Sequence, residues 1–256
     1  LNSNADGGAN TQAVTITDAS VDAAAIATLM ADNGQLTSGD ITFISSSLYG
    51  SVAEINAIYA TDGFIADHTA DNTADTFGLS TIDITVEGTT NTAEQIRIIT
   101  GYTTGTVTAT IDNGQTMANL LATNTGLNEA ISDSFAGHDL TITVDDPIIQ
   151  SADLETLATL TKGTITLDTD TSTTAIESPA VQGTITSINA AFAESKITGL
   201  AGAAVTITGG ATVAQINALN TTGVITATVS DGSVTALDGL TETTNALSLS
   251  VTDASI

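Results

Sequence analysis

The sequence predicts an α/β repeat fold, an open solenoid in which short parallel β-strands alternate with short helices. Three observations lead to this prediction. Stretches with alternating apolar residues recur along the chain, and segments with apolar residues at helical spacing follow most of them. In addition, residues 250–256 (SVTDASI) nearly repeat residues 15–21 (TITDASV). A motif that returns at a distance indicates a chain built from similar structural units.

Two kinds of strand are expected in each unit, because apolar alternation and the abundant β-branched threonine both favour strands. The first kind begins at Val14, Ile82, Leu140, Val205 and Leu247. The second kind follows glycine in GTVTATI at Gly105, GTITLDT at Gly163 and GVITATV at Gly223, and is DITFISSS from Asp40 in the first unit. These glycines are expected to end the preceding helices in the left-handed conformation.

A helix is predicted after each complete strand. The helices that follow the first strands are SVDAAAIATLMA from Ser20, NTAEQIRIIT from Asn91, SADLETLATL from Ser151 and TVAQINALN from Thr212. Ser, Thr or Asn at the start of each is a suitable N-cap, although Ser151 lacks the partner for a capping box. Shorter helices are expected from Ser51, Gln115, Ser187 and Ser233. Since helices this short are marginal alone, packing against the strands must hold them.

The predicted domain organisation is a polar N-terminal tail, residues 1–13, followed by one continuous repeat domain, residues 14–256. Its units lie near residues 14–81, 82–139, 140–204 and 205–246, with a partial unit at 247–256. Strand–helix steps of this size could also close into a barrel, but unequal unit lengths and matching ends favour an open array. The chain begins with Leu1, so we expect it to be processed or cut from a longer protein.

The charge excludes several kinds of partner. The chain has 3 Lys and Arg against 29 Asp and Glu, a formal net charge of −26, which repels nucleic acid and anionic membrane surfaces. No apolar run is long enough for membrane insertion, and without cysteine there are no disulfides or thiolate metal sites. The acidic surface has two interpretations, solubility or the binding of a cation such as calcium.

Catalysis is not expected from this sequence. Hydrolytic triads need a base such as histidine, and we expect the two histidines, His68 and His138, to lie in exposed loops. Paired carboxylates could cleave sugars, but the chain has no Trp and few aromatic residues to bind them. Three cationic side chains are too few for an anion-binding site. The sequence therefore predicts a protein that is not an enzyme.

Acidic residues recur where the first strands end, at Asp18, Glu87, Asp145 with Asp146, and Asp253. One interpretation is that aspartate favours turns and helix starts. The other is weak calcium binding between neighbouring units, for which the candidate ligands are Asp145, Asp146, Asp168 and Asp170. Neither an EF-hand loop nor the glycine-rich calcium-binding nonapeptide is present.

The stretch TVAQINALNTTGVITATVSDGSVTAL, residues 212–237, resembles Thr-, Ala- and Asp-rich repeats of very large secreted or surface-exposed proteins, mainly cyanobacterial. These are often labelled calcium-binding or adhesin-like. The resemblance covers most of the chain through its cadence and carries over no catalytic residue. It implies an extracellular or cell-surface location, a structural or adhesive role, and calcium as a cofactor.

The leading hypothesis is a structural protein of a surface layer, filament or giant adhesin. The alternatives are a module that binds a surface or glycan, as in a fibre tip, and a carbohydrate-active enzyme. A repeat array that stops within a unit leaves an uncovered strand edge and apolar face. We therefore expect end-to-end association, by self-association or by continuation in a longer chain. The predicted interface comprises Val14, Ile16, Leu247, Leu249 and Val251.

Overall fold

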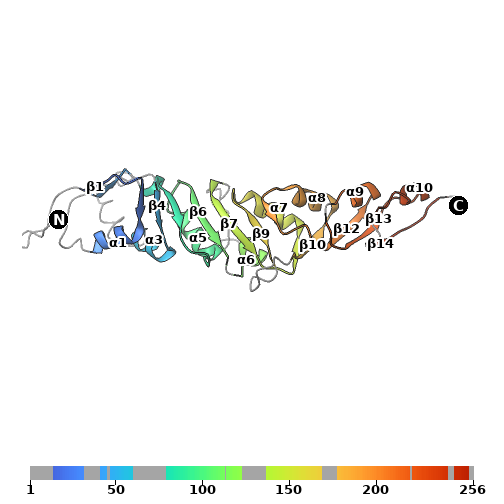
Figure 1. Cartoon of the computed structure of the whole chain (residues 1–256), viewed down its shortest axis with the longest axis horizontal. Helices are drawn as coiled ribbons and strands as arrows, with labels where there is room; N and C mark the ends of the chain where they lie inside the picture. The colour runs from blue at the N-terminus through green and yellow to red at the C-terminus, as the bar shows by residue number, and fades with distance from the viewer. Residues whose placement is uncertain are drawn as a thin grey trace, which may run out of the picture. The chain divides into compact units, whose positions relative to one another are not determined.

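The computed structural model describes residues 14–31, 41–44, 47–59, 79–112, 114–122, 137–168, 178–219, 221–241 and 245–253 (Figure 1). The chain divides into two compact units: unit 1 contains residues 1–111 and 131–140, and unit 2 contains residues 112–130 and 141–256. The predicted tail, residues 1–13, lies outside the described residues. The predicted single repeat domain and the boundaries of its units stay predictions.

Unit 1 contains parallel strands and short helices. In chain order its elements are β1 (Val14–Ile16), β2 (Ser20–Asp22), α1 (Ala23–Ala31), β3 (Ile41–Phe43), β4 (Ser47–Gly50), α3 (Val52–Tyr59), the 3-10 turn η1 (Leu79–Thr81), β5 (Asp83–Val86), α5 (Ala93–Thr100) and β6 (Val107–Ile111). The strands β6, β5, β4 and β2 pair in that order, and β1 pairs with β3. Helices α1, α3 and α5 lie along these strands, with α3 between the other two (Figure 1).

The core of unit 1 lies between the strands and these helices. Leu48, Ile84 and Val107 are in register on adjacent strands, and all three side chains are fully buried. Ile55 of α3 and Ile96 of α5 are equally buried. Burying such a side chain contributes about 1.5–3 kcal/mol to stability. The sheet and its helices are therefore held together mainly by aliphatic packing, as the low aromatic content predicts.

Two of the few aromatic residues form a contact in unit 1. The rings of Tyr59 and Tyr102 stack with their centroids 4.5 Å apart. The Tyr59 hydroxyl donates to the Leu79 carbonyl at 3.0 Å, and the Tyr102 hydroxyl donates to Asn56 Oδ1 at 3.0 Å. Burial raises the pKa of Tyr102 above its ordinary value. The pair fastens the end of α3 to the turn after α5 and to η1.

Unit 2 has the same kinds of element. They are α6 (Met117–Leu120), most of β7 (Asp139–Val144), β8 (Ile148–Gln150), α7 (Ser151–Thr159), β9 (Ile165–Leu167), β10 (Ala180–Gly183), α8 (Ile185–Ala193), β11 (Ile197–Thr198), β12 (Val205–Ala211), α9 (Val213–Asn217), β13 (Ile225–Val229), α10 (Val234–Leu237) and β14 (Ala246–Ser248). One parallel series runs β7, β9, β11, and a second runs β8, β10, β12, β13, β14.

The predicted fold class is confirmed at the coarser level. The structure is α/β, with parallel strands that alternate with short helices, and the strands begin within a residue or two of most predicted positions. The strand predicted from Leu247 is shorter than expected and ends at Ser248. The strands lie in separate sheets, and the open solenoid stays a prediction.

Three predicted N-caps are wrong. Ser20 begins strand β2, which pairs with β4, and α1 starts only at Ala23, whose turn is capped by Asp22. Asn91 is buried, and its amide donates to the Gly88 and Thr110 carbonyls, so the N-cap of α5 is Thr92. Ser151 is the first residue of α7, and its hydroxyl bonds Ser187 Oγ at 2.6 Å. Ser20 is therefore part of a strand, whereas the side chains of Asn91 and Ser151 bond to groups outside their own helices.

Two of the later short helices have N-caps one and three residues from the predicted positions. Thr116 caps α6 in place of Gln115, and Thr184 caps α8 in place of Ser187. Thr212 and Ser233 cap α9 and α10 as predicted, and Thr212 forms a complete capping box with Gln215.

The glycines before the second strands do not adopt the predicted left-handed conformation. The described glycines with positive φ are at other positions. Glycine is required at Gly105 and Gly223 by close approach, because a Cβ there would collide with the carbonyls of Ile82 and Ala203 respectively. The residue two positions earlier explains this approach. Thr221 Oγ1 donates to the Ala203 carbonyl at 2.7 Å and accepts from the Gly223 N–H at 3.0 Å.

The same Thr-x-Gly corner occurs in unit 1. Thr103 Oγ1 donates to the Ile82 carbonyl at 2.6 Å and accepts from the Gly105 N–H at 2.9 Å. One threonine hydroxyl therefore connects each corner to the preceding strand, and the adjacent glycine leaves room for the contact. This arrangement gives the high threonine content a specific role besides strand propensity.

Candidate assembly surface

Three helices in unit 2 share a capping arrangement in which an aspartate comes from a following segment. The Val213 N–H at the start of α9 donates to Asp231 Oδ2 at 2.7 Å, and Asp231 follows β13. The Val234 N–H at the start of α10 donates to Asp253 Oδ2 at 2.7 Å. The Met117 N–H of α6 donates in the same way to Asp146. A carboxylate at a helix N-terminus accepts a hydrogen bond from a free N–H and interacts favourably with the positive end of the helix dipole.

These contacts bear on the recurrent acids at strand ends. Asp146 and Asp253 act at helix starts, which agrees with the interpretation that aspartate was placed there for turns and helix caps. Among the described residues, no group of three or more His, Cys, Asp or Glu could hold a metal ion. The predicted ligand Asp170 lies outside the described part.

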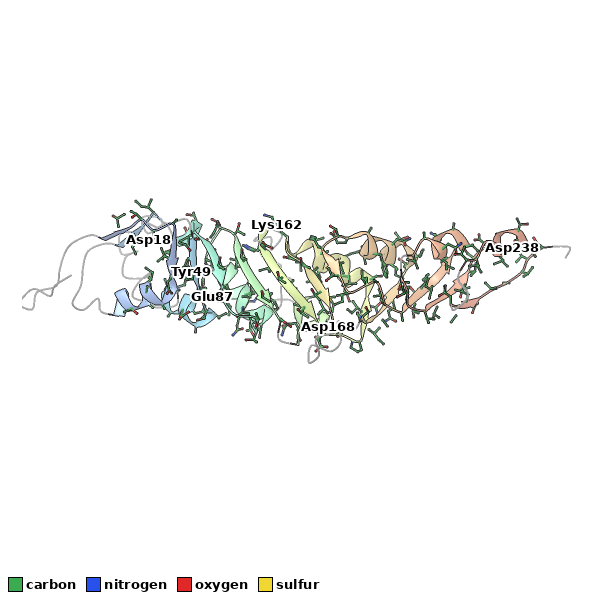
Figure 2. All side chains as sticks on the ribbon, viewed as in Figure 1. Asp18, Tyr49, Glu87, Lys162, Asp168 and Asp238 are labelled. Atoms are coloured by element: carbon green, nitrogen blue, oxygen red, sulfur yellow. The ribbon has the colours of Figure 1, made fainter. Side chains whose placement is uncertain are left out.

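Two other members of the predicted calcium set, Asp145 and Asp168, follow the ends of the paired strands β7 and β9, where Val144 lies opposite Leu167. The Asp145 N–H donates to the Gln115 carbonyl at 2.9 Å, and the Asp168 N–H donates to the Val144 carbonyl at 3.1 Å. Asp168 is buried at the end of β9, and it is labelled in Figure 2. Calcium binding by Asp145, Asp146, Asp168 and Asp170 stays a prediction.

The expectation of exposed histidines is wrong for His138 and falls outside the described residues for His68. His138 is buried, and its Nδ1 accepts from the Val107 N–H of β6 at 3.0 Å. The apolar surroundings of β6 bury the ring, and the backbone N–H fixes its orientation. Sequence reasoning missed this role because nothing in AGHDL distinguishes a loop histidine from a buried one.

One of the three cationic side chains has a structural role as well. Lys196 Nζ donates to the Thr161 carbonyl at 2.9 Å and to the Ala158 carbonyl near the end of α7. A cation there complements the negative end of the helix dipole. Neither His138 nor Lys196 lies in an arrangement that suggests chemistry on a substrate.

The last two helices of unit 2 have similar sequences but different burial. In α9 and the turn after it, Val213 is 6% exposed, Ile216 is fully buried and Leu219 is 9% exposed. In α10 the residue that corresponds to Val213 is Val234, which is 46% exposed, and α10 has no buried residue. The segment after α10 covers α9: Asn217 Nδ2 donates to the Gly239 carbonyl at 2.7 Å. No described segment covers α10 in the same way.

The segment that follows β14 is also exposed. Within the part of the chain that the structure describes, β14 pairs with β13 alone and lies at one edge of its sheet. Leu247 is half-buried, but Leu249 is 52% exposed and Val251 is 49% exposed. Hydrogen bonds hold the segment, from the Thr252 N–H to the Gly232 carbonyl at 2.8 Å and from the Val234 N–H to Asp253. The structure therefore places Leu249 and Val251 on an edge beside the uncovered helix.

The predicted N-terminal part of the interface lies in unit 1. Ile16 is half-buried in β1, and the side chain of Val14 is outside the described part. Asp18 is exposed between β1 and β2 (Figure 2). Among the described strands, β2 pairs with β4 alone and lies at one edge of its sheet.

Sequence reasoning missed Val234 and the capping role of Asp231, although both left a signal. Ser233, Val234 and Leu237 repeat the spacing of Thr212, Val213 and Ile216. Matching the two helices residue by residue aligns Val234 with Val213, but this match does not show that Val234 is exposed.

No family model matches the chain, and neither does any curated protein or solved structure. Within the described ranges, no helix is long and apolar enough to cross a membrane.

Proposed function

We propose that this protein is an extracellular or cell-surface structural protein that assembles end to end in a filament, surface layer or giant adhesin. The observation that carries the proposal is the contrast between Val213, which is 6% exposed, and Val234, which is 46% exposed in the corresponding position. The apolar residue is buried in α9 and exposed in α10. Such an exposed helix face is suited to pack against a further strand and helix.

The local arrangement supports an open solenoid as the architecture of the assembly. β12 pairs with β13 and β13 with β14, all in parallel and in chain order. Each of α9 and α10 is capped by an aspartate that follows the next strand. In this pattern β14 and α10 present the same kind of strand edge and helix start that β13 and α9 present to the segment after them.

The proposed receiving surface consists of Val234 on α10 and Leu247, Leu249 and Val251 in the last segment. The partner is a second copy of the chain or a continuation of it, which contributes its first strand with Val14 and Ile16. Since each copy carries a formal net charge of −26, association should strengthen as salt screens the repulsion. Calcium would act in the same direction and remains part of the proposal.

A charge on the receiving helix tests the proposal. Sedimentation velocity over a range of concentrations should give a mass that rises with concentration for the wild-type chain. Val234→Lys should remain monomeric, because it places an ammonium group on the apolar face that the partner must desolvate.

Val224→Lys is the matched control, since Val224 is also 46% exposed. The residue in the corresponding place before β12 is Ala204, which stays exposed although β13 follows it. Position 224 therefore points away from the neighbouring unit, and this variant should associate like the wild type. A wild-type chain that stays monomeric at every concentration would contradict the proposed function.

A further inference from the structure

We propose that association proceeds by replacement: the first segment of a second copy, residues 14–31, takes the place of residues 249–253, and its Asp18 caps α10 in place of Asp253. This inference rests on the proposed end-to-end association and specifies its register. The partner is a second copy of this chain, and the contact that defines the register is Asp18 on the Val234 N–H.

The sequence correspondence supplies the first step. Residues 15–21 and 250–256 match so that Thr17 corresponds to Thr252 and Asp18 to Asp253. In the same alignment Val14 and Ile16 correspond to Leu249 and Val251. The incoming segment therefore carries the same backbone donor, the same carboxylate and similar apolar side chains as the segment that it replaces.

The contacts of the resident segment supply the second step. Thr252 donates its N–H to the Gly232 carbonyl, and Asp253 accepts from the Val234 N–H at the start of α10. Thr252 lies so close to Gly232 that a Cβ on this glycine would collide with the Thr252 side chain. Thr17 has the same side chain and fits the same place. Leu249 and Val251 remain half exposed, so the resident segment has little buried surface to lose.

The gain in buried apolar surface would come from helix α1 of the second copy. It follows Asp18 after five residues and packs on α3 in its own unit. A segment that brings α1 to the position after β14 covers the face of α10 that contains Val234. Among the described strands, β1 pairs with β3 and β2 pairs with β4, each along one edge, so insertion along the other edge breaks neither pairing. Addition of a strand to an open sheet edge is an established mode of recognition between chains.

The two aspartates give effects of opposite sign, which tests the inference in the full chain. Asp18→Ala should weaken association about tenfold, because the incoming segment loses the cap on α10. Asp253→Ala should strengthen association several-fold, because it loosens the resident competitor. Glu94→Ala removes one exposed carboxylate from α5 and controls for the change in net charge. Dissociation constants from sedimentation velocity provide the comparison, and circular dichroism confirms that each variant is folded.

The outcomes separate this inference from the proposed function. If the wild type associates, Asp18→Ala matches Glu94→Ala and Asp253→Ala binds more weakly, then the second copy adds to residues 249–253 and replacement is wrong. If neither the wild type nor Asp253→Ala associates, both the inference and the proposed function are wrong.

A labelled mixture tests the contact itself. Asp253→Ala chains labelled with ¹⁵N should show a shift of the Val234 amide resonance when unlabelled wild-type chains are added. Unlabelled Asp18→Ala chains should leave that resonance in place. An equal shift with both partners would overturn the assignment of Asp18 to this contact.

Discussion

The helices α9 and α10 have the same beginning but different surroundings. Both start after a Thr or Ser cap, both have an aspartate from a following strand on their first N–H, and both carry an apolar residue there. Val213 is nonetheless buried and Val234 is half exposed. The difference indicates that burial of each helix depends on the strand and helix that follow it in the chain. Neither helix buries its apolar residues by itself.

The largest expected effect on stability comes from a charge placed at the buried position of α9. Ile216 is fully buried in α9, and Leu237 occupies the corresponding place in α10, where it is half-buried. Ile216→Asp should lower the free energy of unfolding by about 3–5 kcal/mol, because it buries an unpaired carboxylate. Leu237→Asp should cost much less in the monomer. Chemical denaturation at low concentration measures both, and equal costs would contradict the difference in packing.

A second prediction concerns the Thr-x-Gly corner that precedes β13. Thr221→Ala should destabilise the fold by about 1–3 kcal/mol, since the Ala203 carbonyl and the Gly223 N–H both lose a partner. The adjacent Thr222→Ala is the control, because Thr222 is exposed. Thermal or chemical unfolding distinguishes the two variants. If Thr221→Ala is as stable as Thr222→Ala, the corner contributes nothing.

The smallest expected effect concerns α3, a helix that is capped by a residue of its own segment and not by a distant aspartate. In α3, the Ser51 hydroxyl and then the Ser51 N–H donate to Glu54, and these bonds lower the pKa of the Glu54 carboxyl. A lowered folded pKa means that this contribution is complete above the unfolded pKa and is lost as the pH falls through the folded value.

An NMR titration checks this sign. Glu54 should titrate below an ordinary glutamate, and Ser51→Ala should move its pKa back toward the ordinary value. Because the cap comes from the same segment, neither titration should depend on protein concentration. A titration of Glu54 at the ordinary pKa in both proteins would show that the cap does not form in solution.

Local patterns in the sequence are sufficient to predict most elements but not their surroundings. Apolar alternation locates β5, β7, β12 and β13, and the cap at Thr212 follows from its own side chain and Gln215. These features depend on residues a few positions apart. The sequence predicts the start of α1 too early, because Ser20 and Val21 pair with β4, which is more than twenty residues away.

The candidate site depends even more on distant residues. Leu249 and Val251 could be named from the echo of the first motif, but Val234 could not, because its exposure follows from the neighbour that it lacks. The sequence predicts the exposure of His138 wrongly for the same kind of reason, because its partner, the Val107 N–H, is 31 residues away. Capping by Asp231 and Asp253 likewise spans 18 and 19 residues.

Hydrogen exchange in α9 and α10 at low and high protein concentration tests the central claim most directly. In both helices amide protons donate to carbonyls four residues back, for example from Ile216 to Thr212 and from Leu237 to Ser233. The account predicts that protection of the Ile216 amide is independent of concentration, whereas protection of the Leu237 amide rises as the chains associate. Protection of Leu237 that is the same at both concentrations, in a protein that associates, would contradict the claim that the next copy completes α10.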